Sequence, residues 1–368
     1  MGSRPRLVLA ALSIGVFALH AQEQQTASSS AVKADAYVRE EVAKRRIPGV
    51  SVAVIATGTV VFTKGYGFAS VELSTPATSD TVYEIASLTK PFTAIAVMML
   101  VEAGRIALDD PISKHLPKLP SQWDAIRVRH LLTNTSGIPD YFSIATLRSA
   151  PGGMWQTEYA PTDLLDILFR TQLAFSPGSR FAYSNSGYWV LGQLVEAVTG
   201  SSYERFLSDR IFVPLGMKAT RRMDRKSIIL NRASGYTWGD GVLLNAPHTS
   251  TTWAYSEGGL VSSVSDLAKW DAALWSGRLL RAESVAQMAA PVHLPDGTDS
   301  NYGFGWTVGT NPKRRQVYVT GNKPGFSAII RRYLDERLTV VVLANVENGI
   351  DLGGTAFELA NFFSPPQR

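Results

Sequence analysis

Ser87 and Lys90 are the first residues in this chain whose types and spacing suggest catalysis. They lie in the segment TVYEIASLTKPFTAIAVMMLVEAG, residues 81–104, a short apolar run followed by a helix that is apolar almost all round. Pro91 fits only near the start of such a helix, and Gly104 suits the position just after its end. Lys90 is therefore three residues from Ser87 on one face of the first turn, within reach of the serine hydroxyl.

This placement would give the pair unusual chemistry. The N-terminus of a helix favours negative charge and disfavours a neighbouring ammonium. A lysine held there can lose its proton and act as a base toward the serine. The chain has a second Ser-x-x-Lys, Ser30 to Lys33, but it falls at the expected start of an exposed amphipathic helix. Helix capping and solvation explain that second copy.

Tyr183 and Asn185 form a second candidate group, in a loop expected between residues 177–178 and a helix that begins near Gly187. A phenol beside an ammonium suits a nucleophilic serine, because the positive charge favours the phenolate. Tyrosine and lysine both have reference pKa values near 10, so either pKa must drop by about 3 units for the group to act as a base at neutral pH. Taken alone, Tyr183 is better explained as a turn residue whose hydroxyl bonds a backbone group.

The elements that position these residues follow a simple order. Strand patterns near the N-terminus and again near the C-terminus enclose a helical middle, which predicts an α+β fold. One antiparallel sheet would be built from both termini and flanked by helices, with an inserted, mainly helical lobe. Strands are expected at residues 50–55, 60–64, 304–308, 316–320, 327–334 and 338–345, and helices at 31–45, 161–173, 187–199, 203–211, 264–274 and 355–363.

The predicted boundaries assign residues 31–107 and 272–368 to the sheet lobe and residues 108–271 to the helical lobe. No internal repeat is visible. We expect the site in the crevice between the lobes, where pockets commonly form.

The N-terminus predicts export. Arg4 and Arg6 precede an apolar run from residue 7 to residue 19. A membrane span needs about 20 apolar residues, so residues 1–21 are interpreted as a cleaved signal peptide, leaving no stable membrane span. Residues 22–30, QEQQTASSS, are expected to be a linker. The protein would then be periplasmic or secreted; an uncleaved anchor is the alternative.

Composition excludes several classes of function. The 45% hydrophobic and 18% charged residues describe a globular protein, and 368 residues suffice for two lobes. The net charge of +5 comes from scattered basic clusters, so no nucleic-acid partner is expected. The chain has no cysteine, and its five histidines are not spaced as metal pairs, so neither a metal nor a cofactor is expected. It also lacks a Gly-x-Ser-x-Gly elbow and a phosphate-binding glycine loop.

Together the motifs resemble the penicillin-recognising serine hydrolases, with their β-lactamase/transpeptidase-like fold. The resemblance is to the branch that holds class C β-lactamases, D-Ala-D-Ala carboxypeptidases, D-aminopeptidases and β-lactamase-like esterases. It covers about residues 47–345 and includes the segments GYGFAS (65–70), LDDPISKHLP (108–117), HLLTNTSGIPD (130–140), VPLGM (213–217), GGLVSSVSDLAKW (258–270) and NKPGFS (322–327).

The resemblance implies a role for each matching residue. Ser87 would be the acylated nucleophile, Lys90 its proton-handling partner and Tyr183 the second base. Asn185 would orient Lys90 and contact the acyl side chain of the substrate. The backbone N–H groups of Ser87 and Asn322 would form the oxyanion hole. His130 has no chemical role in this family and is expected to be a buried hydrogen-bonding residue.

The chain departs from the family at the third motif. Relatives carry a Lys/His-Thr/Ser-Gly triplet that helps to hold a substrate carboxylate, and the matching substrate-binding residues here are Val319, Thr320 and Gly321. Valine cannot make this charge-assisted contact, worth about 1.5–3 kcal/mol. We therefore expect a preference for uncharged esters or amides. The cations that could replace the missing charge are Lys323, Arg314 and Arg315.

Three functions are compatible with these motifs. The favoured one is an exported serine hydrolase that acts through acylation and deacylation of Ser87, esterase-like or D-amino-acid peptidase-like. A class C-like β-lactamase is the second, and Val319 argues against it. The third, a penicillin-binding protein with little turnover, is disfavoured because the four catalytic residues are intact. In each case we expect a monomer that takes a small-molecule ester, amide or β-lactam.

Overall fold

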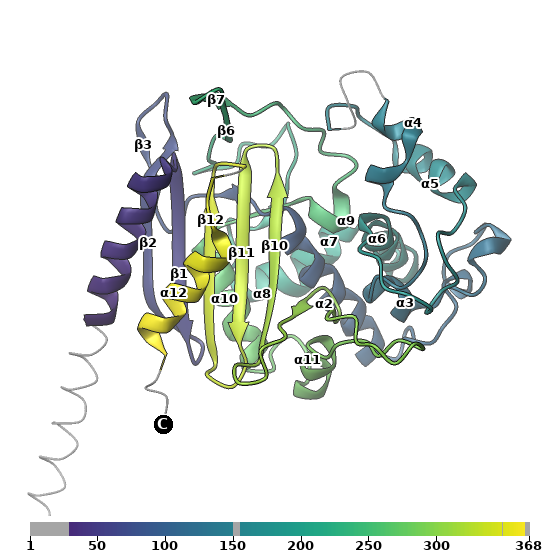
Figure 1. The fold of residues 1–368 in the computed structure, drawn as a ribbon. Helices are drawn as coiled ribbons and strands as arrows, with labels where there is room; N and C mark the ends of the chain where they lie inside the picture. The colour runs from purple at the N-terminus through teal and green to yellow at the C-terminus, as the bar shows by residue number, and fades with distance from the viewer. Residues whose placement is uncertain (1–28, 150–154, 348, 365–368) are drawn as a thin grey trace, which may run out of the picture.

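The computed structural model describes residues 29–149, 155–347 and 349–364. An antiparallel sheet with helices on both faces lies beside a mainly helical region (Figure 1). The predicted signal peptide and residues 22–28 of the predicted linker lie outside the described residues, whereas residues 29 and 30 already belong to the first helix. No helix within the described ranges is long and apolar enough to cross a membrane.

The main sheet has seven strands in the order β3-β2-β1-β12-β11-β10-β9. Neighbouring strands pair antiparallel. The prediction of an α+β fold whose sheet combines strands from both termini is therefore confirmed. The strands are β1 (Gly49–Ala56), β2 (Thr59–Ser70), β3 (Thr75–Pro76), β9 (Thr307–Val308), β10 (Gln316–Lys323), β11 (Phe326–Tyr333) and β12 (Leu338–Ala344).

The predicted hairpin between β1 and β2 is confirmed. Ala56 pairs with Thr59, so the turn consists of Thr57 and Gly58. Both have positive φ, +50° and +81°, as the twist of a two-residue hairpin requires. The strand expected at residues 304–308 is reduced to the two residues of β9.

Helices cover both faces of this sheet. The first helix (residues 29–45) and α12 (Leu352–Phe363) pack on one face, seen in front of the strands in Figure 1. Alternate residues of β12 face opposite ways: Val340 and Val342 contact this outer layer, whereas Val341 and Leu343 join the larger core on the other face. Because β1 and β12 are buried on both faces, their sequences are almost continuously apolar.

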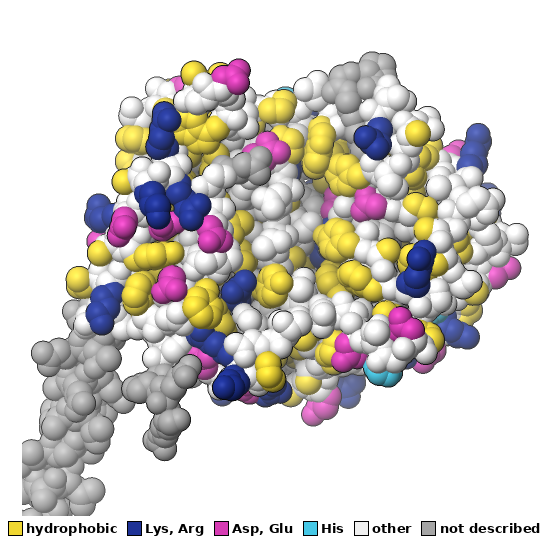
Figure 2. Space-filling model, in the orientation of Figure 1, with side chains coloured by type: hydrophobic (Ala, Val, Ile, Leu, Met, Phe, Trp, Pro, Cys, Tyr) yellow, Lys and Arg dark blue, Asp and Glu magenta, His cyan; other side chains and the backbone are white. Residues whose placement is uncertain are grey.

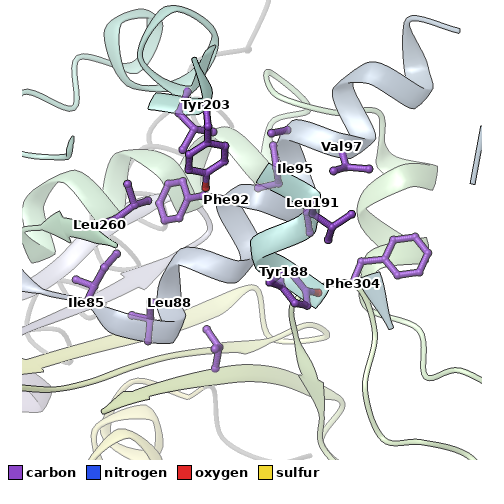
Figure 3. Close-up of a cluster of buried hydrophobic side chains, with 14 of the residues drawn as sticks. Ile85, Leu88, Phe92, Ile95, Val97, Tyr188, Leu191, Tyr203, Leu260 and Phe304 are labelled. Atoms are coloured by element: carbon purple, nitrogen blue, oxygen red, sulfur yellow. The ribbon is translucent and has the colours of Figure 1, made fainter. Parts of the chain in front are cut away.

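The helix expected to be buried all round is α2 (Thr89–Glu102), which runs through the larger core. Figure 3 shows Phe92, Ile95 and Val97 of this helix surrounded by apolar side chains from several elements. Gly104 (φ +67°) follows the helix as expected, and its N–H donates to the carbonyl of Val101. A rigid, buried helix therefore anchors the segment that carries Ser87.

The helical region is less regular than its sequence suggests. Its helices are α3 (Val128–Leu132), α4 (Ala145–Arg148), α5 (Pro161–Arg170), α6 (Asn185–Thr199), α7 (Tyr203–Leu207), α8 (Val213–Leu215) and α9 (Tyr255–Gly258). Two small sheets that the sequence did not predict join them, β4-β8-β5 (Tyr83–Glu84, Leu260–Ser262, Arg221–Arg222) and the hairpin β6-β7 (Tyr236–Gly239, Val242–Asn245). Helix α11 (Ala282–Met288) was not predicted either.

Helix α10 (Val264–Trp275) packs against β1, β2 and β12. The predicted boundary between residues 271 and 272 falls inside this helix, which belongs with the sheet. A single large core extends from the sheet into the helical region.

Candidate active site

Ser87 lies in a single turn of 3₁₀ helix, Ala86–Leu88, that leads directly into α2. This is the position expected from the sequence, and Ser87 remains partly accessible. The preceding residue, Ala86, has φ +45°, in the left-handed region that non-glycine residues rarely adopt. Such local strain is common at functional turns, where the surrounding structure maintains it.

Lys90 is completely buried, and its Nζ atom lies 3.0 Å from the Oγ atom of Ser87. Two further residues accept hydrogen bonds from this ammonium. Asn185 Oδ1 lies 2.7 Å away, and Glu257 contributes both its backbone carbonyl at 2.9 Å and its carboxylate Oε2 at 2.8 Å. The lysine is thus held among four acceptor atoms, one of them the candidate nucleophile.

The protonation state of Lys90 differs from the sequence-based expectation. Burial alone would lower its pKa, but the opposite charge of Glu257 and the neighbouring Tyr183 outweigh burial and raise the pKa above 10.5. The ion pair with Glu257 therefore favours the ammonium form of Lys90, contrary to the expectation that it loses its proton. A base that deprotonates Ser87 would then have to be another group.

Tyr183 is in position to be that group. Its hydroxyl lies 3.0 Å from Ser87 Oγ, and its ring centroid is 5.0 Å from the ammonium of Lys90. Tyr183 is 42% exposed and lines the pocket beside Ser87.

The segment HLLTNTSGIPD supports the loop that carries Tyr183. The carbonyl and the side-chain oxygen of Asn134 accept hydrogen bonds from the N–H groups of Ala182 (2.9 Å) and Ser184 (3.1 Å). Ser184 then caps α6 by accepting from the N–H of Gly187. The tyrosine is therefore fixed between two anchored residues.

Asp140 orients Asn185. Its Oδ2 atom accepts hydrogen bonds from both the backbone N–H and the side-chain Nδ2 of Asn185, each at 2.8 Å. The amide oxygen of Asn185 must then face Lys90, as the 2.7 Å contact requires.

Strand β10 forms the opposite wall of the site. It packs so closely on the serine turn that a Cβ atom on Gly321 would lie 2.3 Å from the carbonyl oxygen of Ile85. Strand β9 pairs only with Val317 and Tyr318, so Asn322 lies beyond the part of β10 that β9 covers. Of the three residues predicted to bind substrate, only Thr320 lines the pocket. Val319 and Gly321 are buried and lie outside the pocket lining.

The three cations proposed to replace the missing charge have different positions. Lys323 lines the pocket, but its ammonium is ion-paired with Glu84. Arg314 and Arg315 pair instead with acidic residues of the β11–β12 turn, Glu336 and Asp335 respectively. Of these three cations, Lys323 is the one that lines the pocket with Ser87.

Ser87, Tyr183, Asn185, Glu257 and Lys323 line one pocket of about 390 Å³. Three aromatic side chains form one wall of it: Phe142, Trp155 and Trp253, whose ring centroids lie 4.7–5.3 Å apart. Figure 2 shows the surface hollowed between the sheet and the helical region, with hydrophobic side chains around the hollow. A larger hollow of about 660 Å³, around residues 204–224, includes none of the predicted catalytic side chains.

Two alternative chemistries find no geometric support among the described residues. No cluster of three or more His, Asp or Glu in this part of the chain could hold a metal ion. His130 is partly buried in α3, where its Nδ1 atom accepts a hydrogen bond from the backbone of Arg127, and it does not line the pocket. Burial lowers its pKa, which favours the neutral ring.

Sequence reasoning missed Glu257 and Asp140, the two carboxylates that hold the lysine and the asparagine. Asp140 is the last residue of the segment HLLTNTSGIPD, and Glu257 directly precedes the segment GGLVSSVSDLAKW. Both segments carry the family resemblance. Glu257 is an isolated acidic residue just before the run GGLVSS, and a lone charge beside such small, apolar residues could have been flagged as buried.

A scan of family models matches the one described as Beta-lactamase to residues 34–361 of this chain. The chain is 33% identical over 307 residues to penicillin-binding protein 4* of Bacillus subtilis, covering 79% of the chain and 66% of that relative. It is 30% identical over 329 residues to a D-aminopeptidase of Brucella anthropi, covering 89% of the chain and 61% of that relative. The chain thus spans slightly less than two thirds of the length of either relative.

A solved structure has a similar fold. The octameric penicillin-binding protein homologue of Pyrococcus abyssi superimposes with a TM-score of 0.78 at 32% identity, covering 90% of this chain and 77% of that one. The similarity therefore includes both the sheet and the helical region.

Proposed function

Because the chain belongs to the Beta-lactamase family, we propose that it is a serine hydrolase that cleaves carboxylic esters or amides through an acyl-enzyme on Ser87. One observation carries this proposal. The hydroxyl of Ser87 lies 3.0 Å from both Lys90 Nζ and Tyr183 Oη, at the wall of an open pocket. A serine with a base and a cation within hydrogen-bond reach can act as a nucleophile.

The backbone N–H groups of Ser87 and Asn322 are proposed as the oxyanion hole. Both residues line the pocket, on facing elements, the serine turn and β10. Preorganised donors of this kind stabilise the developing oxyanion by about 3 kcal/mol each.

The pocket supports a substrate that carries no carboxylate near the scissile bond and has a bulky apolar acyl group. Lys323, which lines the pocket, is ion-paired with Glu84, and the buried Lys90 beside Ser87 is ion-paired with Glu257. The aromatic wall offers apolar contact area to the acyl side chain. The similarity to a D-aminopeptidase supports amides or esters of D-amino acids as the substrate class. The proposed location, periplasmic or secreted, rests on residues 1–21 alone.

A second candidate, β-lactam hydrolysis, is favoured by Lys323. A cation that lines the pocket could bind the carboxylate of a β-lactam if its ion pair with Glu84 opened.

Hydrolysis of p-nitrophenyl butyrate, of D-phenylalanine p-nitroanilide and of a chromogenic cephalosporin tests these functions, with Ser87→Ala as the control. We expect turnover of the ester and the anilide, little turnover of the cephalosporin, and none in the variant. Rapid cephalosporin turnover would establish the second candidate instead. A stable penicillin adduct without turnover of any substrate would indicate a penicillin-binding protein, and full activity of Ser87→Ala would disprove the role of this serine.

A further inference from the structure

Glu257 is a charged group in the pocket to which the proposed acylation assigns no role. It is 5% exposed and lies in the short helix α9. One carboxylate oxygen accepts a hydrogen bond from Lys90 at 2.8 Å, and the other accepts one from the hydroxyl of Tyr141 at 2.6 Å. Among the described residues, it provides the carboxylate that lies within ion-pair distance of Lys90.

The contacts of Lys90 restrict where the proton of Ser87 can go. An ammonium has three N–H donors and no lone pair, so it cannot accept a proton. Ser87 Oγ has two side-chain neighbours in the site, Lys90 Nζ and Tyr183 Oη, each at 3.0 Å. While the lysine is charged, Tyr183 is the neighbour that can receive the proton.

We propose that Glu257 is a positioning residue that holds Lys90 as an ammonium throughout the catalytic cycle, so that Tyr183 alone exchanges the proton with Ser87. This inference rests on the proposed function and assigns separate roles to Lys90 and Tyr183 within it. The carboxylate acts through the lysine and need not touch the substrate. Its two carboxylate oxygens bond to Lys90 and to Tyr141, so it supplies charge to the lysine through a hydrogen bond of its own.

The proton balance of the cycle is complete without Glu257. In acylation, Ser87 Oγ bonds to the carbonyl carbon as its proton moves to the phenolate of Tyr183; the bond to the leaving group then breaks, and the proton passes to that oxygen or nitrogen. In deacylation, a water molecule gives its proton to Tyr183 and bonds to the acyl carbon. The proton returns to Ser87 as the ester bond breaks. Lys90 stabilises the negative charge that moves between the two oxygens.

Other titratable groups that face the Lys90–Glu257 pair do not replace the carboxylate. Tyr141 binds it directly, and Tyr183 and Tyr188 present their rings to the ammonium at 5.0 and 5.7 Å. The remaining groups around the pair are Asp140 behind Asn185, Tyr203 of α7, and the paired Lys323 and Glu84 at the pocket. Removing the charge of Glu257 therefore leaves a buried ammonium with no salt-bridge partner among the residues that the structure describes.

The test compares the pH dependence of kcat/KM for p-nitrophenyl butyrate in the wild type and Glu257→Gln, between about pH 6 and pH 10. Glutamine keeps an oxygen for the hydrogen bond but removes the charge, so burial should lower the pKa of Lys90. Activity that the wild type keeps at high pH should then fall in the variant, about tenfold for each pH unit above the lowered pKa, because the charged fraction of Lys90 falls by that factor.

Two matched variants distinguish an effect of the charge of Glu257 from an effect on the local structure. Tyr141→Phe removes a hydrogen bond to the same carboxylate but keeps its charge, so its alkaline limb should match the wild type. Glu257→Asp should also keep the wild-type pH dependence of kcat/KM at alkaline pH, even if its rate is lower. If Glu257→Gln lowers the rate equally at every pH, or if Tyr141→Phe shifts the limb as much, Glu257 has only a structural role and the proposal is wrong.

The outcome remains clear if Glu257→Gln does not fold. Breaking a buried ion pair from one side is strongly destabilising, whereas removing both charges is much less so. A folded Lys90→Met/Glu257→Gln double variant would then show that the unpaired ammonium caused the failure, and an unfolded one would contradict the pairing. Activity that persists in Ser87→Ala refutes the proposed function; an inactive Ser87→Ala with an unshifted Glu257→Gln profile refutes this inference alone.

Discussion

The ammonium of Lys323, at the end of β10, is ion-paired with the carboxylate of Glu84, which precedes the serine turn. Both side chains are largely buried, and Lys323 lines the pocket. The ammonium of Lys323 in the pocket is therefore already paired with a carboxylate of the protein. This explains in physical terms how a family member could lack a free charge for a substrate carboxylate.

Releasing this cation should change substrate preference. In Glu84→Gln, Lys323 loses its counter-charge, and we expect kcat/KM for a chromogenic cephalosporin to rise about tenfold, the lower end of the value of a charge-assisted contact. Turnover of p-nitrophenyl butyrate, which has no carboxylate, should change little. The control Glu84→Gln/Lys323→Met should lose the gain. An unchanged cephalosporin rate in Glu84→Gln would show that Lys323 does not reach the substrate.

The carboxylate of Asp35 connects the first helix to β2. It accepts hydrogen bonds from Lys64 at 2.7 Å, Tyr66 at 2.8 Å and Arg39 at 3.0 Å. The contact with Lys64 contributes most to a lowered pKa of about 2 for Asp35, against an ordinary value of 3.8. Because the folded chain has the lower pKa, this stabilisation is complete above pH 3.8 and is lost as the pH falls toward 2.

Thermal unfolding of the wild type and Asp35→Asn should show this dependence. We expect the variant to unfold at a lower temperature near neutral pH, where the native carboxylate is charged and paired. The difference in unfolding temperature between the wild type and the variant should become smaller below pH 3.8 and disappear near pH 2. A gap of the same size at every pH would mean that Asp35 stabilises the helix by packing instead of by charge.

The sequence was informative wherever structure depends on residues close together in the chain. The apolar run after Ser87, with Pro91 near its start and Gly104 after its end, located α2 and put Lys90 beside the serine. The Thr57-Gly58 turn fixed the register of the first hairpin. Such signals are local, so they need no knowledge of tertiary contacts.

The rest of the site depends on contacts that no local pattern encodes. Glu257 is 167 residues from Lys90, and Asp140 is 45 residues from Asn185. The strands β4, β5 and β8 have two or three residues each, too few for a periodic pattern. The charge of Lys90 was misjudged for the same reason, because it is set by a carboxylate distant in sequence.

Phe142 should determine preference for the acyl group. It lines the pocket and packs against Trp155 and Trp253 with centroid distances of 4.9 and 5.3 Å. In Phe142→Ala we expect kcat/KM for p-nitrophenyl phenylacetate to fall about two- to tenfold more than for the acetate, consistent with the value of one aromatic contact. The control is Phe68→Ala, on β2 and 42% exposed, which should affect neither ester. Equal losses on both esters in Phe142→Ala would place the acyl group elsewhere.

The distance between β10 and the serine turn should be critical for catalysis. In Gly321→Ala the new Cβ atom would lie 2.3 Å from the carbonyl oxygen of Ile85, so β10 and the turn must move apart. That movement separates Asn322 from Ser87, the two proposed oxyanion donors, and a displacement of about 1 Å can cost 100-fold in rate. We therefore expect kcat for p-nitrophenyl butyrate to fall about 100-fold.

The matched control for this change is Gly187→Ala, also close to the site. The nearest atom to its new Cβ would be the carbonyl oxygen of Leu131 at 3.6 Å, an ordinary van der Waals distance, and alanine favours the helix α6 in which it lies. This variant should keep most of its activity. Circular dichroism and thermal unfolding should show that both variants fold. The change at Gly321 affects the contact between β10 and the serine turn and leaves the core around α2 intact. If Gly321→Ala folds and retains wild-type kcat, the proposed oxyanion hole between the serine turn and β10 is wrong.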